Sequence, residues 1–550
     1  MADRLQKRNI AVQLSILIAS GWLVYQLILF RHVRAMVQRD SVHPTDGPVQ
    51  VEGVRDTPWQ RILKHQNVLD SENEGKNAPQ QCNHLYGIDH VRDYRNFLPL
   101  CEGPAGKEDT LVRCASFSST HPFAEHDKHK EATCEGLNLV VNGSAVQKWS
   151  DVLEDRHRTK KGGGQPMPPR GLLSGRCKEV GPGVTRGTEG SGGQKFLRST
   201  FQTYNGSGLE RGRDRPQLDH TRLHRKIGPM ELNMEPTMKS MGKNLQFECE
   251  GIVEHAVYVV AEPWGYMNLW HGFEEITSMF VAYAVHNLDP ADAQVLVADG
   301  RAGSNMTNSF GVHGPLVDSF SRKAPPLSLV DAMRQIAPQG GNACFKRIIF
   351  STWGQPSIQA AGSYHNMARI RLSAPYKCGP SSIFLGLRDH ILENLGQPRA
   401  AADPTSLRIL WLERSTRLTG HESAMLELIE TAALRHGASV IRQDLSLLGY
   451  MEQIQLVQTV SVLIGIHGAA FTWGFLLPQG GSIIEISRES LGARCYCYVT
   501  AANSVGASHT SVLFRSNSNT ERERLMKTVD TALANLKENR PDKESIQEHH

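Results

Sequence analysis

Apolar and polar positions follow two different periodicities along the second half of the chain, one typical of strands and one typical of helices. From about residue 245 onward, short apolar runs predict buried strands, and stretches with helical periodicity predict helices between them. Residues 397–406 break this pattern and predict a linker. Before the linker, the predicted strands are 257–262, 294–299 and 346–352, and the predicted helices are 266–287 and 383–394.

After the linker the alternation is more regular. Strands that alternate with helices indicate βαβ units, in which helices cover both faces of a parallel sheet. Two such units in tandem predict an α/β protein of two facing Rossmann-like domains, with a ligand cleft beyond the carboxyl ends of the strands. The strands predicted here are 407–414, 438–444, 462–467 and 482–487, and the helices are 421–437, 450–460 and 469–477.

The N-terminal region has a different character. Residues 10–30 are a run of 21 residues without a charged side chain, and a helix of that length crosses the hydrocarbon core of a membrane, which is about 30 Å thick. The run is too long for the apolar region of a cleaved signal peptide, and no small-residue cleavage site follows it. It therefore predicts a single-pass transmembrane signal anchor behind a cytosolic tail at 1–9, with a polar stem over 31–80.

Local composition divides the remainder of the chain. Residues 158–225 are of low complexity and rich in glycine, which predicts a disordered insertion. We expect this insertion within an N-terminal domain over 81–398. A C-terminal domain over 399–515 and a terminal helix and tail over 516–550 complete the predicted order.

Charge and cysteine content exclude several classes of protein. The chain has 60 Lys and Arg against 56 Asp and Glu, a net charge of +4, so no basic excess indicates nucleic-acid binding. Its 10 cysteines form no C-x-x-C pair, which argues against a zinc ribbon or a thioredoxin-type site. The glycosylation sequons at Asn142, Asn205 and Asn305 all follow the anchor. They predict that the body lies in the secretory lumen, where cysteines can pair.

The strongest local feature is the segment 462–486. A buried strand ends at His467, and Gly468 is expected to turn the backbone tightly into a helix that begins near Ala469. The start of such a helix presents unpaired N–H groups and a positive dipole end, which suit a phosphate. The next strand ends at Glu485, whose carboxylate is a candidate acceptor for sugar or ribose hydroxyls. A simple tight turn beside a buried core histidine is the alternative.

This segment resembles the HGAGLT signature of glycosyltransferase family 61, and reads HGAAFT here. The Glu452–Gln453 pair that precedes it also resembles the family pattern. The motifs follow the family's order over about residues 250–500. The others are a helix motif, NLWHGFEEITSMF at 268–280, a Cys-Phe-Arg/Lys-like strand, CFKRIIFS at 344–351, and a paired-arginine strand, LRILWLERSTRLTG at 407–420.

The resemblance implies a GT-B-like, inverting transferase that moves xylose or N-acetylglucosamine from a UDP-sugar to a glycoprotein or N-glycan acceptor. The C-terminal domain would bind the nucleotide sugar, and the N-terminal domain would face the acceptor. Arg414 and Arg417 follow the carboxyl end of a strand and are candidates to hold the diphosphate, unless they are solvated surface arginines. The chain has no Asp-x-Asp sequence, so we expect neither a metal nor a tightly bound cofactor.

An inverting transferase needs a base that takes the proton of the acceptor hydroxyl. His271 and Glu275 are four positions apart, so a helix places both on one face. The family motif favours Glu275 as the base and His271 as a substrate contact or an orienting group. Glu274, the adjacent carboxylate, is the alternative candidate for the base.

The expected location is the Golgi membrane, with the endoplasmic reticulum as the alternative. The alternative function is a catalytically silent relative that binds a glycan or a nucleotide in the lumen. A hydrolase has little support, because no G-x-S-x-G sequence is present.

Overall fold

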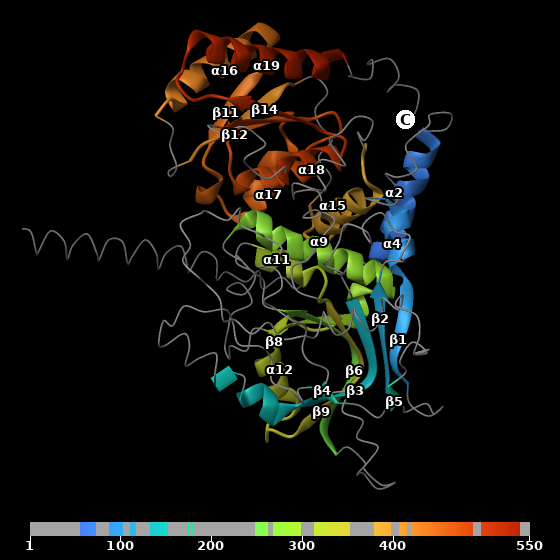
Figure 1. Ribbon diagram of the computed structural model, residues 1–550. Helices are drawn as coiled ribbons and strands as arrows, with labels where there is room; N and C mark the ends of the chain where they lie inside the picture. The colour runs from blue at the N-terminus through green and yellow to red at the C-terminus, as the bar shows by residue number, and fades with distance from the viewer. Residues whose placement is uncertain are drawn as a thin grey trace, which may run out of the picture. The chain divides into compact units, whose positions relative to one another are not determined.

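Two β-sheets organise the chain (Figure 1). The structure is a computed structural model, and the helices and strands described below lie within these ranges. The described residues are 55–72, 87–102, 110–116, 133–148, 150–151, 173–174, 178–179, 248–261, 268–298, 313–351, 379–397, 406–414, 420–487 and 497–538.

The first sheet combines a parallel half and an antiparallel half. Strands β6 (Cys249–Ala261), β7 (Ala293–Ala298), β8 (Leu327–Ser328) and β9 (Asn342–Ser351) are parallel, in the spatial order β8-β7-β6-β9. Counted along the chain this is 3-2-1-4, the order of the first four strands of a Rossmann fold. The antiparallel half was not predicted. It consists of β1 (Asn96–Glu102), β2 (Leu111–Ser116), β3 (Thr133–Asn142), β4 (Leu173–Ser174) and β5 (Lys178–Glu179).

Helices cover both faces of the parallel half. On one face α9 (Leu269–His286) packs in the same apolar core as Tyr258 and Val260 of β6. On the other face α12 (Leu329–Ile336) packs with Val257 and Val259 of the same strand. Burial on both sides explains why the second half of β6, residues 256–261, is a continuous apolar run in the sequence. Shorter helices here are α4 (Ile88–Tyr94), η3 (Pro290–Asp292) and α11 (Gly314–Asp318).

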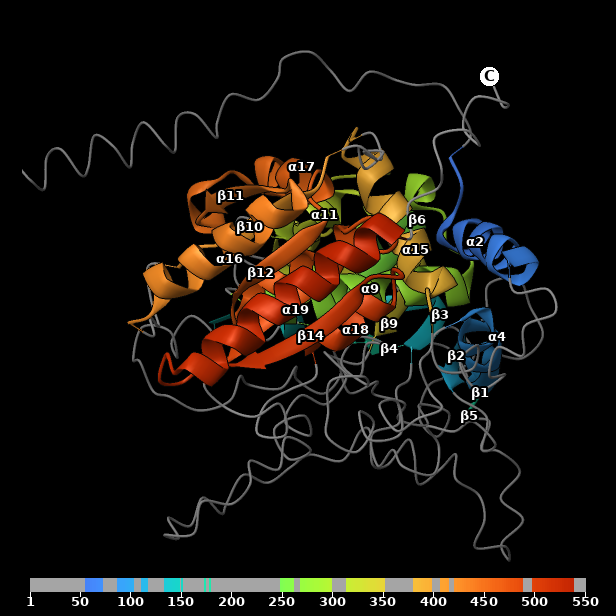
Figure 2. The ribbon, with the colours of Figure 1, turned by 90° about the horizontal axis from the view of Figure 1, so that it is seen from above.

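The second sheet is wholly parallel, in the order β11-β10-β12-β13-β14. Counted along the chain this is 2-1-3-4-5, a doubly wound order. Helices α16 (Glu422–His436) and α19 (Asn519–Glu538) lie side by side on one face (Figures 1 and 2). The strands are β10 (Arg408–Leu412), β11 (Ser439–Gln443), β12 (Val462–Ile466), β13 (Ser482–Ser487) and β14 (Ser508–Leu513). The opposite face carries α17 (Tyr450–Gln458), η6 (Ala469–Leu476) and α18 (Cys497–Asn503), and η5 (Leu445–Leu447) follows β11.

Alternate residues of β10 enter different cores. Ile409 and Trp411 pack with α16 and α19, whereas Leu410 and Leu412 pack with the helices of the opposite face. The side-chain period of two in a strand produces this division. The predicted strands and helices of this segment are confirmed, with η6 a 3₁₀-helix.

One apolar core continues from the first sheet to the second. Phe273 of α9 stacks on Phe475 of η6, with ring centroids 4.2 Å apart, and both belong to this core. Helix α15 (Ser382–Asn394) and helix α2 (Pro58–Glu72) also pack in it, and Ile62 of α2 is fully buried. Residues 56–550 accordingly form one compact unit. The prediction of a stem reaching residue 80 is wrong for 58–72, because this helix is part of the body.

A disulfide joins two neighbouring strands of the first sheet. Cys249 of β6 is bonded to Cys344 of β9, with 5.7 Å between their Cα atoms. The sequence left this pairing open, because the two cysteines are 95 positions apart.

Several predictions fall on residues that the structure does not describe. The anchor at 10–30 lies outside the described residues, as does the insertion at 158–225 except for β4 and β5. Among the helices of the described ranges, none has both the length and the apolar character required to cross a membrane.

Candidate functional site

The second sheet has a topological switch point between β10 and β12. These strands are neighbours in the sheet, and the chain leaves them toward opposite sides, to β11 and to β13. Ligands of open parallel sheets bind beyond the carboxyl ends of the strands at this point. Arg414 follows β10 and His467 follows β12, so the topology brings two predicted site residues together.

Arg414 and the turn after β12 are in direct contact. The Arg414 guanidinium donates a hydrogen bond from Nη1 to the carbonyl oxygen of His467. Gly468 is extended, with φ 179° and ψ 163°, so a left-handed turn does not require glycine here. A Cβ atom at this position would instead collide with the Arg414 guanidinium. The predicted bend from strand to helix is present, since η6 begins at Ala469, but the glycine serves here by leaving room for the Arg414 guanidinium.

Glu485 lies at the centre of a row of three side chains. His467 Nδ1 is 2.5 Å from Glu485 Oε1, and His509 Nε2 is 2.9 Å from Glu485 Oε2. The Glu485 residue is 2% exposed. Burial opposes ionisation, but hydrogen bonds from His467 and His509 outweigh it and lower the pKa of Glu485 to about 2. Both carboxylate oxygens thus face imidazoles, so the predicted direct contact with sugar or ribose hydroxyls does not fit this geometry.

We expect Glu485 to make folding stability depend on acid pH. Its folded pKa, about 2, is below the ordinary value of 4.5, so its contribution is fully present above about pH 4.5 and is lost as the pH falls toward 2. The contribution lost is about 3 kcal/mol. Urea unfolding at several pH values should show a steeper acid loss for wild type than for Glu485→Gln.

Glu430→Gln is the control for this experiment, because Glu430 is an exposed carboxylate of α16. It should retain the pH dependence of the wild type. Equal acid losses in wild type and Glu485→Gln would contradict the assignment.

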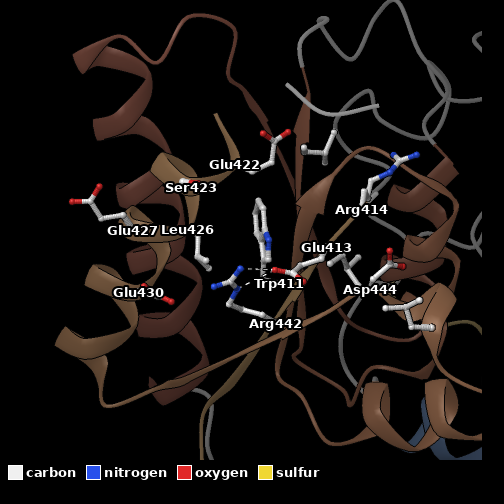
Figure 3. A pocket seen from close by; sticks show the side chains of 13 residues that line it. Trp411, Glu413, Arg414, Glu422, Ser423, Leu426, Glu427, Glu430, Arg442 and Asp444 are labelled. Atoms are coloured by element: carbon white, nitrogen blue, oxygen red, sulfur yellow. Dashed lines mark hydrogen bonds and ion pairs between the residues drawn. The ribbon is translucent and has the colours of Figure 1, made fainter. Parts of the chain in front are cut away.

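A cavity of about 570 Å³ opens beside Arg414 (Figure 3). Helix α16 contributes its first turns to the wall, and β10 and β11 contribute the residues at their carboxyl ends. Trp411, Leu426 and Leu447 give it apolar surface. Arg442 donates two hydrogen bonds to Glu413 Oε1, at 3.0 and 2.7 Å. The charged residues of the wall are Glu413, Arg414, Glu422, Glu427, Glu430, Arg442 and Asp444.

This cavity was not predicted from the sequence. Its carboxylates outnumber its guanidinium groups, so it suits hydroxyl groups better than phosphates. Glu422 and Asp444 could have been noticed, since Asp444 ends a predicted strand and Glu422 lies in the first turn of a predicted helix.

The first turns of α9 border the same site. Asn268 caps this helix, since its Oδ1 accepts a hydrogen bond of 2.9 Å from the Trp270 backbone N–H. The Trp270 indole donates to Glu274 Oε1 at 2.8 Å and packs edge-on against Tyr498, with ring centroids 5.4 Å apart. Tyr498 is also 5.4 Å from the ring of His467. An aromatic contact therefore connects α9 to the turn after β12.

The predicted catalytic base of α9 and its orienting histidine are only partly described. Glu275 is 4% exposed and Glu274 is 6% exposed, so both carboxylates are buried. His271 lies in α9, but its side chain is outside the described part of the structure, as is the whole of Arg417. In the part that is described, no group of three His, Cys, Asp or Glu side chains is arranged so that it could hold a metal ion.

Other residues of the sequence motifs make contacts that hold the fold together. Gln453 Oε1 accepts a hydrogen bond of 2.8 Å from the Trp473 indole, and Glu452 accepts one of 2.7 Å from the Gly449 backbone N–H. These contacts hold α17 against η6 and cap its first turn. Gly420, the last residue of the paired-arginine motif, has a φ of 83°. Glycine adopts this left-handed conformation without steric cost, which explains the residue type at this position.

The chain is similar to several curated transferases. It is 23% identical over 268 residues to the EGF domain-specific O-linked N-acetylglucosamine transferase of Bos taurus, covering 48% of this chain and 45% of that protein. The enzyme of the same name from Xenopus laevis is 24% identical over 250 residues, and that from Drosophila melanogaster 23% over 246 residues. The matched segment thus spans less than half the length of these relatives. The resemblance to family 61 is confirmed as distant homology.

The similarity of the chain to solved structures is weak. No protein-family model matches the chain. A diflavin flavoprotein from Nostoc sp. aligns with 28% of this chain at 14% identity and a TM-score of 0.20, and a flavodoxin-like domain from Synechococcus sp. aligns with 24% at a TM-score of 0.19. Scores this low carry no functional argument.

Proposed function

Because the chain is a distant homologue of EGF domain-specific O-linked N-acetylglucosamine transferases, we propose that it is an inverting glycosyltransferase. It transfers N-acetylglucosamine or xylose from a UDP-sugar to a glycoprotein or N-glycan acceptor. The convergence of Arg414 with the His467–Gly468 turn, at the switch point of a parallel sheet, is the observation that carries this proposal.

In the proposed complex the donor lies across the carboxyl ends of β10 and β12. Its diphosphate binds to Arg414, to Arg417 and to the backbone at Gly468 and Ala469, where η6 begins. The nucleoside occupies the adjoining cavity, which offers the indole of Trp411 and carboxylates for ribose hydroxyls. Glu485 acts through His467 rather than on the sugar itself.

The acceptor approaches from the side of α9, where we assign Glu275 as the base and His271 as its orienting partner. The aromatic contact from Trp270 through Tyr498 to His467 brings the start of α9 close to the donor turn, which supports this arrangement. Departure of the diphosphate is stabilised by arginine and by the start of η6. We propose a GT-B-like division of labour, with no metal and no tightly bound cofactor.

The proposed location is the secretory lumen, with the body anchored as a type II protein in the Golgi membrane or, as the alternative, in the endoplasmic reticulum. The Cys249–Cys344 disulfide supports an oxidising compartment. In sealed microsomes, a C-terminal tag should resist protease until detergent is added. Digestion without detergent would refute this orientation.

The function is tested by incubating the purified chain with UDP-N-acetylglucosamine and with UDP-xylose, each with EGF-domain and N-glycan acceptors. Mass spectrometry of the products should detect transfer of one sugar. Tight donor binding without transfer or hydrolysis would instead support the second candidate, a silent nucleotide-binding relative.

We expect Arg414→Ala to weaken UDP binding by roughly ten- to a hundredfold. The loss of a charge-assisted hydrogen bond is worth about 1.5–3 kcal/mol. Calorimetric titration with UDP measures the change, and circular dichroism checks the fold, since Arg414 also holds the His467 carbonyl. Arg435→Ala is the control, because Arg435 pairs with Asp530 on the outer helices. Unchanged affinity in Arg414→Ala would refute the placement of the diphosphate.

A further inference from the structure

The two ring nitrogens of His467 have different surroundings. Nδ1 donates to Glu485 Oε1, because an ionised carboxylate can only accept. Nε2 has no hydrogen-bond partner among the residues that the structure describes. The side chain is 19% exposed. His467 therefore has one nitrogen fixed by a buried anion and the other available to a ligand.

Two further contacts fix the position of this imidazole. The carbonyl oxygen of His467 accepts the hydrogen bond of Arg414, which ties the residue to the end of β10. The ring of Tyr498 in α18 lies against it, with centroids 5.4 Å apart. The charged and aromatic groups in contact with His467 are thus Glu485 from β13, Arg414 from the end of β10 and Tyr498 from α18.

His509 determines how Glu485 is presented. It contacts the second carboxylate oxygen at 2.9 Å from the neighbouring strand β14, and its side chain is buried. A carboxylate held at both oxygens cannot rotate away from His467. Neither His509 nor this row of three side chains was recognised in the sequence, because its members come from the residue after β12, from β13 and from β14.

We propose that binding of the nucleotide-sugar diphosphate is coupled to the uptake of a proton by His467, with Glu485 and His509 as positioning residues. This coupling rests on the proposed function. With a diphosphate at the start of η6, the imidazole lies between that anion and the Glu485 carboxylate. An anion on each side favours the protonated form, and histidine changes charge in the physiological pH range.

The proton has a specific use in this site. Protonated His467 donates from Nε2 to a diphosphate oxygen, and a hydrogen bond between two charged groups is stronger than a neutral one. The positive charge also offsets the negative charge that remains on the diphosphate when the sugar leaves. The Arg414 guanidinium is always charged and cannot make donor binding depend on pH, whereas an imidazole at the diphosphate can.

The coupling is tested by calorimetry on the full chain in detergent, without acceptor. UDP-N-acetylglucosamine and UDP-xylose are titrated at about pH 7.5 in buffers of different ionisation enthalpy. The diphosphate of each donor is esterified at both ends and has no group that titrates near neutrality, so exchanged protons come from the protein. The binding heat should vary with the buffer and indicate uptake of up to about one proton per bound donor.

The variants assign the proton to its site. His467→Gln should lose the buffer dependence, and Glu485→Gln should reduce it. His509→Gln keeps a donor for Glu485 and should retain most of the uptake, whereas His509→Leu should not. Asp530→Asn is the matched control, because Asp530 pairs with His436 at 3.2 Å on the outer helices, and it should behave as the wild type.

The possible failures are distinguishable. If the wild type binds neither donor, the proposed function and the coupling are both wrong. If it binds a donor with the same heat in every buffer, or if His467→Gln keeps the uptake, the coupling is wrong and the proposed function stands. These two readings use the wild type and His467→Gln, which both keep the buried Glu485, so they do not depend on the folding of Glu485→Gln.

Discussion

Replacing Glu275 by glutamine is expected to lower turnover by about 10²–10⁴ while donor affinity stays near that of the wild type. Glutamine keeps the size and the hydrogen bonding of the side chain but cannot accept the proton of the acceptor hydroxyl. Steady-state kinetics with a saturating donor measures turnover, and calorimetry with UDP measures donor binding. A loss confined to turnover would assign the proton transfer to this carboxylate.

Glu274→Gln is the matched control, since the two carboxylates are adjacent and similarly buried. Glu274 accepts the hydrogen bond of the Trp270 indole, and the amide oxygen of glutamine can accept the same bond. Turnover should therefore remain close to that of the wild type. Loss of turnover in Glu274→Gln alone would mean that the roles are exchanged. Activity in both variants would place the base elsewhere.

Removing the disulfide between Cys249 and Cys344 is expected to lower the free energy of unfolding by about 2–5 kcal/mol. The bond joins strands β6 and β9 across a sequence separation of 95 residues. A cross-link over such a long loop reduces the entropy of the unfolded chain, and this is the main source of the expected stabilisation. Urea unfolding of the Cys249→Ala/Cys344→Ala double variant measures the loss.

The double variant is preferable to a reductant, because Cys134 is also in a disulfide and would be reduced as well. Peptide mapping without reduction should recover the cross-linked Cys249 and Cys344 peptides from the wild type. Unfolding curves that coincide for wild type and the double variant would show that this bond does not stabilise the body.

Much of the second sheet could be predicted from local pattern. Continuous apolar runs at β10, β12 and β13 identify strands buried on both faces, and the intervening helices have their own periodicity. Strand β14 was missed because it lies at the edge of the sheet, and its sequence, SHTSVL, mixes polar and apolar residues. The antiparallel strands of the first sheet escaped for a similar reason, since Pro99 and charged residues interrupt their apolar pattern.

The candidate site, like the sheets, could be predicted only in part from local pattern. Local composition is enough to place Arg414, His467 and Glu485 at or just after the ends of strands, because strand ends are visible in the pattern of apolar residues. The folded chain was needed to show that β10 and β12 are neighbours, that His509 contacts Glu485, and that Trp270 contacts Tyr498. Strand order and side-chain contacts bring together residues far apart in the chain, and the pattern along one segment contains no information about which other segment will lie beside it.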